Sequence, residues 1–413
     1  MLRSLFSGIS GLRADQTMLD VVGNNIANVN TAGFKGGQVV FEDTLSQMLK
    51  AGGAPQNGNG GTNPAQVGLG VQVAGITNSF TQGAQQTTGR PTDLMIQGDG
   101  MFMVKNAGEV LYSRAGAFTL DASGRITNPD GAVVQGWMAD SKGVVNTNAS
   151  TGDLMVTVGQ TVPPQATTDA TVSGNLPAGA TPFSAGPPPT GTQLNTSITT
   201  YDGQGVAHTM SYVLSAAATP NQWTMDVYLD GSATAASTST VTFDPATGAL
   251  ATPATSPTVT TPWGPVAVNV TGMTQYGGQS SLQAVTPLSG GGAQSGSLQS
   301  FTVAPDGSIV GVFSNGLKQT LGQVALATFA NPPGLEKAGD STYRATVNSG
   351  TPQVGTAQSG GRGQLSSGAL EMSNVDLAQE FTELIIAQRG FQANSRVITT
   401  SDQVLQDLVD LKR

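Results

Sequence analysis

The chain has 413 residues, enough for two to four domains, and 38 % of them are hydrophobic, which supplies only modest cores. Only 10 % are charged, and the 55 glycines with abundant Thr, Ser and Asn favour turn-rich β structure over a helical enzyme core. The net charge is −9 and no Lys or Arg lies between Lys142 and Lys318, which argues against nucleic acid as a partner and against a polybasic membrane anchor.

Residues 1–50 predict an N-terminal helical segment used in assembly. Four apolar residues spaced by seven mark its stripe: Leu5, Leu12, Leu19 and Ile26. This spacing indicates a helix that winds against another helix. Gly33 is placed to end the helix in a left-handed conformation. Ser and Gly interrupt the apolar residues near the N-terminus, so we expect neither a cleaved signal peptide nor membrane insertion.

The middle of the chain predicts nested β domains. A flexible Gly- and Asn-rich linker covers residues 51–66, and an inner β domain is expected in two parts, 67–150 and 297–365. An outer β domain, 151–296, is inserted between these parts. Turn-forming dipeptides predict hairpins at three places, which are residues 129–131, the meander 194–229 with turns at 202–203 and 220–221, and residues 305–307.

Residues 366–413 predict a second helical assembly segment. Its stripe is again spaced by seven and consists of Leu377, Leu384, Phe391, Ile398 and Leu405. Ser373 and Asp376 are spaced as the N-cap and N3 residues of a capping box. Both stripes contain polar or small interruptions, such as Gly23 and Gln388. The spacing therefore leaves two arrangements open, a coiled coil of the two ends or amphipathic helices on a globular core.

Residues that could carry chemistry are sparse. Cysteine is absent, and the single histidine, His208, lies in alternating sequence typical of a strand. No complete phosphate-binding loop, dinucleotide fingerprint or metalloprotease motif occurs in the sequence. A β-rich glycosidase or adhesin is the alternative, but carboxylates and aromatic residues are few for that role. We therefore expect a protein that is not an enzyme and has no cofactor or metal.

Both ends closely resemble the signature of flagellar rod and hook proteins. The N-terminal motif is LDVVGNNIAN at 19–28 with TAGFK at 31–35, and the C-terminal motif is GALEMSNVDL at 368–377 with AQR at 387–389 and DQVL at 402–405. The resemblance implies assembly roles for these motif residues, in addition to the two stripes: Asn24, Asn25, Asn28, Gly33, Phe34, Ser373, Asn374, Gln388 and Arg389.

The middle separates hook from rod, because residues 201–208 and 326–335 resemble hook proteins in particular. The resemblance implies a multi-domain, mainly β chain that polymerises outside the cell into a curved hollow tube and transmits torque from rod to filament. Implied partners are further copies of the chain, the rod, the hook cap, the hook–filament junction proteins and the flagellar type III export apparatus. A distal-rod or other axial subunit is the alternative.

Overall fold

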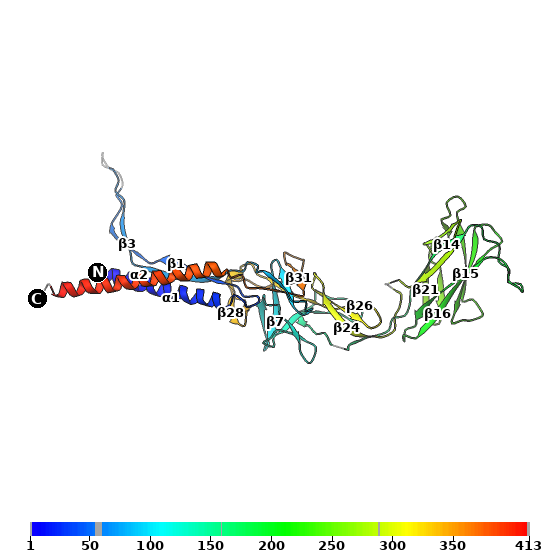
Figure 1. Cartoon of the computed structure of the whole chain (residues 1–413), viewed down its shortest axis with the longest axis horizontal. Helices are drawn as coiled ribbons and strands as arrows, with labels where there is room; N and C mark the ends of the chain where they lie inside the picture. Colours follow the sequence, from blue (N-terminus) through cyan, green and yellow to red (C-terminus); the bar gives the residue numbers. More distant parts are fainter. Residues whose placement is uncertain (1, 54–59, 158, 288–289, 411–413) are drawn as a thin grey trace. The chain divides into compact units, whose positions relative to one another are not determined.

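The computed structural model describes residues 2–53, 60–157, 159–287 and 290–410 (Figure 1). The described chain has one α-helix at each end, α1 (Leu2–Ala27) and α2 (Leu377–Asp410), with β-strands between them. The prediction of a mainly β chain with helical termini is thus confirmed. The chain divides into two compact units. Unit 1 is Met1–Thr157, Phe301–Val310 and Thr320–Arg413, and unit 2 is Val158–Ser300 and Gly311–Gln319.

Unit 1 holds the helices and a sheet in which β26, β11, β7, β8, β29 and β28 are successive neighbours. Its elements are β1 (Gly37–Asp43), β2 (Ser46–Lys50), β3 (Ala65–Gly68), β4 (Val71–Asn78), β5 (Gln85–Thr87), β6 (Leu94–Gln97), β7 (Met101–Asn106), β8 (Glu109–Ser113), β9 (Thr119–Leu120), β10 (Ile126–Thr127), β11 (Val133–Met138), β12 (Gly152–Asp153), β27 (Leu326–Thr328), the 3-10 helix η1 (Pro332–Gly334), β28 (Glu336–Gly339), β29 (Thr342–Arg344), β30 (Gln353–Gly355), β31 (Gln364–Ser367) and β32 (Ala369–Glu371). Strands β24 (Gly296–Val303), β25 (Ser308–Phe313) and β26 (Lys318–Val324) each cross a boundary of the two units.

The core of unit 1 covers both faces of this sheet, because the consecutive residues Met101 to Val104 of β7 are all buried. Phe102 and Phe118 are fully buried and pack edge to face, with ring centroids 5.1 Å apart. The hairpin predicted at 129–131 is confirmed, because Thr127 of β10 pairs with Val133 of β11. The turn predicted at 305–307 is also confirmed, since the Gly307 amide donates to the Ala304 carbonyl between β24 and β25.

Unit 2 has two five-stranded sheets around one apolar core, and its short strand β13 pairs instead with β24. Its strands are β13 (Thr161–Val162), β14 (Asp169–Pro177), β15 (Gln193–Tyr201), β16 (Ala207–Ala216), β17 (Gln222–Leu229), β18 (Ser237–Phe243), β19 (Leu250–Thr252), β20 (Thr258–Thr261), β21 (Gly264–Asn269), β22 (Met273–Tyr276) and β23 (Ser281–Val285). Alternating burial along β16 and β17 directs Tyr212, Leu214 and Trp223 into the core. The predicted meander is confirmed as the antiparallel strands β15, β16 and β17.

Three boundary predictions need correction. α1 ends at Ala27, well before Gly33, and residues 37–43 and 46–50 are strands rather than part of a helical segment. The reason is that Asn24, Asn25 and Asn28 favour turn hydrogen bonds over further helix, and the Asn28 amide side chain donates to the Asn24 carbonyl at 2.9 Å.

The capping box was also assigned to the wrong residue. Asp376 is the N-cap of α2, because its Oδ1 accepts hydrogen bonds from the amides of Ala378 (2.8 Å) and Gln379 (3.4 Å). Ser373 instead accepts from the amide of Val375 in a turn before the helix. In the predicted linker 51–66, Gly53 pairs with Thr62 and β3 begins at Ala65, whereas residues 54–59 lie outside the described residues.

Candidate assembly site

The two terminal helices pack side by side and antiparallel in unit 1, α1 in blue and α2 in red and orange (Figure 1). Small residues lie where the backbones approach most closely. A Cβ atom on Gly8 would lie 3.3 Å from Ile398, and one on Gly11 only 2.5 Å from the side-chain nitrogen of Asn394. Asn394 in turn donates to the Asp15 carboxylate at 2.9 Å. The centre of the contact is therefore narrow and partly polar.

The heptad stripes are only partly buried in one chain, although Ile398 takes part in the close contact with Gly8. The half-buried members are Leu5, Leu12, Leu19, Ile26, Leu384, Ile398 and Leu405. Leu377 and Phe391 are each 40 % exposed, and Gln388 and Arg389 also face solvent. The fully buried apolar residues of the helices are instead Ala14, Val22 and Ala387.

Much apolar surface on the helices has no cover within one chain. Phe6 is 65 % exposed, and on α2 Phe381, Ile385 and Ile386 are each more than half exposed. Exposed large apolar side chains that gather on one surface mark a site of interaction. The single chain thus leaves its helical ends incomplete as a packed structure.

Asparagines from both signature motifs join the ends of the chain to each other. The buried Asn25 accepts from the Gly37 amide (2.9 Å) and donates to the Gly37 carbonyl (2.8 Å) and to Glu380 of α2 (3.0 Å). Asn374 accepts from the Gly36 amide at 2.9 Å and donates to the Ser79 carbonyl at 2.9 Å. These side chains therefore hold together the N-terminal segment, the C-terminal segment and the residue that follows β4.

Gly33 and Phe34 seat the N-terminal segment on the β body. Gly33 has φ of +71°, and a Cβ there would lie 2.4 Å from the Ala115 amide nitrogen, so only glycine fits. Its own amide donates to the Glu371 carbonyl at 2.7 Å. Phe34 is buried, and the Lys337 ammonium lies 5.0 Å from its ring centroid.

A buried ion cluster of Lys35, Arg114 and Glu371 includes the residue that follows Gly33 and Phe34 in the chain. Glu371 accepts from Lys35 Nζ at 2.5 Å and from Arg114 Nη1 at 3.2 Å, and all three side chains are at most 4 % exposed. Lys35 also donates to the Thr81 carbonyl at 2.7 Å. Burial lowers the pKa of the Lys35 ammonium, and the hydrogen bond to Glu371 opposes that change. The cluster thus joins both terminal motifs to β8 and the loop that follows it.

Sequence reasoning missed this cluster and the small-residue contact as sites. Lys35 and Glu371 stand inside the two signature motifs, but nothing in their spacing shows that they meet. For the helix contact a signal existed, because glycines at 8 and 11 weaken a helix unless close packing requires them.

Two further predicted assembly residues lie near the end of α1. Asn24 is exposed, and Asn28 accepts a hydrogen bond from the Thr31 hydroxyl at 3.1 Å.

His208 of unit 2 has more partners than an ordinary strand residue. Its Nδ1 lies 2.7 Å from Asp230 Oδ2, and its ring stacks on Trp263 with centroids 4.0 Å apart. The hydrogen bond from His208 lowers the pKa of the Asp230 carboxyl. Among the described residues no group of three or more His, Asp or Glu side chains is arranged to hold a metal ion. Neither described helix is long and apolar enough to cross a membrane.

The fold and the uncovered helical ends define a class, that of structural subunits with helical termini and β units between them. Four family models match the chain: "Flagella basal body rod protein" at residues 5–35, "Flagellar hook protein FlgE/F/G D1 domain" at 95–175, "Flagellar basal body protein FlaE D2 domain" at 167–287 and "Flagellar basal body rod FlgEFG protein C-terminal" at 366–411.

Among similar proteins, the flagellar hook protein FlgE of Borreliella burgdorferi is 39 % identical, with all of both chains covered. The flagellar basal-body rod protein FlgG of Bacillus subtilis is 33 % identical, again over both whole chains. A crystal structure of Helicobacter pylori flagellar hook protein FlgE2 matches with a TM-score of 0.52 and 14 % identity, covering 70 % of this chain and 100 % of that one. The chain therefore belongs to the flagellar hook protein family, as its motifs predicted, and is a structural protein of the flagellum that serves motility.

Proposed function

We propose that the chain polymerises through α1 and α2 into the curved, hollow tube of the hook and acts there as a universal joint that passes torque from rod to filament. The observation that carries the proposal is the apolar surface left uncovered on the helices, with Phe6, Phe381, Ile385 and Ile386 as its largest members. Burying such surface between copies stabilises an assembly by about 25 cal/mol per Å² before association costs.

In the polymer, the heptad stripes become the contacts of a coiled coil between helices of neighbouring copies. Leu5, Leu12 and Leu19 are only half-buried in one chain and have capacity for further contacts. Nested domains complete the proposal, with an inner β domain of residues 67–150 and 297–365 and an outer domain of 151–296. The division of the chain into two units with an inserted unit 2 is consistent with that nesting.

The remaining roles follow from the same family. We propose export through the flagellar type III apparatus without a cleaved signal peptide, an extracellular position in the hook, and contacts with the rod, the hook cap and the hook–filament junction proteins. We propose no enzymatic activity and no cofactor. The assembly residues are the two stripes together with the motif residues that join the ends, such as Asn25, Gly33 and Asn374.

Electron microscopy of polymer formed from the purified full-length chain tests this function. Curved hollow tubes are expected. Straight, stiff tubes would favour the alternative, a distal-rod subunit, to which the full-length similarity to a rod protein of Bacillus subtilis lends weight. A chain that remains monomeric at all concentrations would contradict both.

A further inference from the structure

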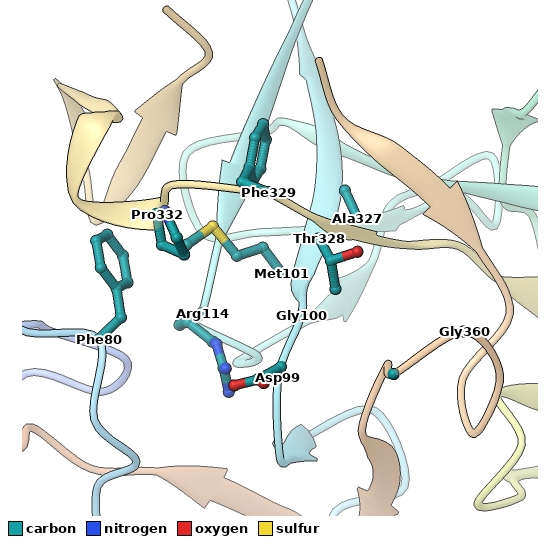
Figure 2. A pocket seen from close by; sticks show the side chains of 11 residues that line it. Phe80, Asp99, Gly100, Met101, Arg114, Ala327, Thr328, Phe329, Pro332 and Gly360 are labelled. Atoms are coloured by element: carbon teal, nitrogen blue, oxygen red, sulfur yellow. The ribbon is translucent and has the colours of Figure 1, made fainter. Parts of the chain in front are cut away.

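Positive charge is distributed very unevenly between the two units. In unit 1, Arg114 lines a pocket of about 310 Å³ together with Asp99 and pairs with Glu371 (Figure 2). Residues 143–317, which make up most of unit 2, contain no Lys or Arg. The acidic residues of this interval are Asp153, Asp169, Asp202, Asp226, Asp230, Asp244 and Asp306. A protonated His208 is therefore the one side chain of the interval that can carry positive charge.

His208 lies between two of these aspartates, which belong to different turns. Its Nδ1 is 2.7 Å from Asp230 Oδ2, and its Nε2 is 3.7 Å from Asp202 Oδ2. Asp230 directly follows β17 and has φ of +49°, and its Oδ1 accepts from the Thr209 amide at 2.8 Å. Within the described ranges these two carboxylates are the charged groups paired with the ring. An imidazolium has an N–H for each of them, whereas a neutral imidazole has only one N–H.

The flat face of the same ring contacts the other sheet of unit 2. His208 is on β16, and Trp263 is at the tip of the hairpin formed by β20 and β21, where Thr261 pairs with Gly264. The two rings stack with centroids 4.0 Å apart and planes 14° from parallel. A cation over an indole face is attracted by the ring, and a neutral imidazole lacks this attraction. The stack therefore joins the two sheets more strongly when His208 is protonated.

The tip of this hairpin is held less firmly than its base. The Trp263 Nε1–H is buried and has no acceptor among the described residues, which disfavours this placement of the indole. Val259 and Val266 of the two strands are at most 1 % exposed, and the Thr261 hydroxyl donates to the Gly264 carbonyl at 2.6 Å. The tip can thus open while the base of the hairpin stays in the core.

Both carboxylates remain charged in the pH range where histidines titrate, about pH 5 to 8. The hydrogen bond with His208 lowers the pKa of the Asp230 carboxyl. Hydrogen bonds from the amides of Val206 and Gln204 lower the pKa of the Asp202 carboxyl. When the ring loses its proton, the two carboxylates therefore stay ionised without a cation, and one hydrogen bond is left.

We propose that His208 is a clasp between the two sheets of unit 2 that closes in acid and opens when the ring loses its proton. The protonated ring bridges Asp202 and Asp230 and holds Trp263 on its face, and the neutral ring releases the hairpin tip. The clasp is closed from about pH 4, above which the carboxylates are ionised, up to the pH at which the ring deprotonates. Because the Asp230 side chain is 51 % exposed, solvent screens the pair, and the change is a local opening rather than loss of the core.

NMR of the full-length, unassembled chain tests the clasp. The single histidine gives one imidazole signal and the three tryptophans give three indole signals, of which Trp263→Phe identifies one. A neutral paramagnetic reagent in solution broadens the signals of exposed groups at any pH. From pH 5 to 8, broadening of the Trp263 signal is expected to rise about twofold or more, with the midpoint of the imidazole titration. Trp223, in the core of the same unit, should show no change.

Three variants separate the clasp from a general effect of pH. His208→Gln should abolish the pH dependence of the Trp263 signal, and Asp230→Asn should reduce it. Asp226→Asn is the matched control, because the Asp226 carboxylate accepts from Thr238 and not from His208, and it should keep the full change.

Two results with the unchanged chain would overturn the clasp even if a variant misfolds. One is constant broadening of Trp263 while the imidazole titrates, and the other is an imidazole signal that does not titrate between pH 5 and 8. An equal pH dependence in a folded His208→Gln chain would overturn it as well.

Discussion

Unit 2 and the terminal helix pair bury their apolar residues in opposite ways. In unit 2 the large side chains Tyr212, Leu214 and Trp223 are at most 1 % exposed, so its core is complete within one chain. On the helices, Phe6 and Ile386 remain 65 % and 59 % exposed. Unit 2 therefore needs no partner for its own stability, whereas the helix pair leaves apolar surface that other copies cover in the proposed polymer.

In unit 1, the buried ion cluster of Lys35, Arg114 and Glu371 joins the segments next to the two helices to the β strands. The strongest test of the comparison is Glu371→Gln, which leaves Lys35 and Arg114 buried without an anion. The expected loss is about 3–5 kcal/mol of unfolding free energy in unit 1. Hydrogen–deuterium exchange, which reports the two units separately, should show faster exchange in unit 1 and none of this effect in unit 2.

Glu336→Gln is the control for this change, because Glu336 is an exposed carboxylate of the same unit. It should leave exchange in both units unchanged. Equal acceleration in units 1 and 2 after Glu371→Gln would show that the two units do not unfold independently, and the comparison would have to be abandoned.

The next largest effect is expected for Leu384→Asp on α2. Leu384 is half-buried in one chain, and a contact with a neighbouring helix would bury it further, so a carboxylate there costs several kcal/mol in each copy of the polymer. We expect a soluble monomer with normal thermal unfolding of its β units and no tubes by electron microscopy. Gln392→Glu, at an exposed position on the same helix, should still form tubes.

The fold was largely predictable from local patterns. Heptad spacing placed both helices, and Asp-Gly and Pro-Asn turns placed the hairpins at 129–131 and 305–307 and the meander of β15 to β17. Helix boundaries failed at Asp376 and Gly33, because hydrogen bonds of side chains decide where a helix begins or ends. The pairing of β7 with β27, more than two hundred residues apart in sequence, has no local signal at all.

The sequence motifs identified residues of the candidate site, but they could not predict which of these residues are in contact. The two signatures identified Asn25, Gly33 and Asn374, yet spacing cannot show that Asn25 contacts Glu380 or that Lys35, Arg114 and Glu371 converge. The stripes lie on the two helices where they were predicted, and their role in assembly stays a prediction. The close approach is set by glycines that a search for apolar periodicity passes over.

A matched pair of glycines separates the contact within one chain from the helix surface. At Gly11 a methyl group would lie 2.5 Å from Asn394, whereas at Gly23 nothing lies within 4 Å. Gly23→Ala should raise the stability of α1 in the unassembled chain by about 0.5–1 kcal/mol through helix propensity. Gly11→Ala should lower it, because Asn394 must give up its hydrogen bond to Asp15.

Helix melting followed by circular dichroism measures both variants. A rise in stability for Gly11→Ala equal to that of Gly23→Ala would show that the helices are not in close contact in the free chain. Loss of polymer with Gly23→Ala alone would place a neighbouring copy against that face of α1.

The smallest effect is expected in unit 2, where His208→Gln removes the hydrogen bond to Asp230. The pKa of that carboxyl is lowered by His208, so the bond contributes stability above the unfolded-state pKa of about 4, and the contribution is lost as pH falls through the lower folded-state pKa. The difference in unfolding temperature between the unchanged chain and His208→Gln should therefore be largest above about pH 4 and shrink toward pH 2. Thr199→Gln, an exposed change on the neighbouring strand β15, should show no such trend.

Because the core of unit 2 is complete without the hydrogen bond from His208 to Asp230, tube formation should be normal in both variants. A difference that is constant with pH would mean that the bond to Asp230 does not stabilise unit 2, and lost tube formation in a stable His208→Gln chain would show that unit 2 contributes to assembly through this residue.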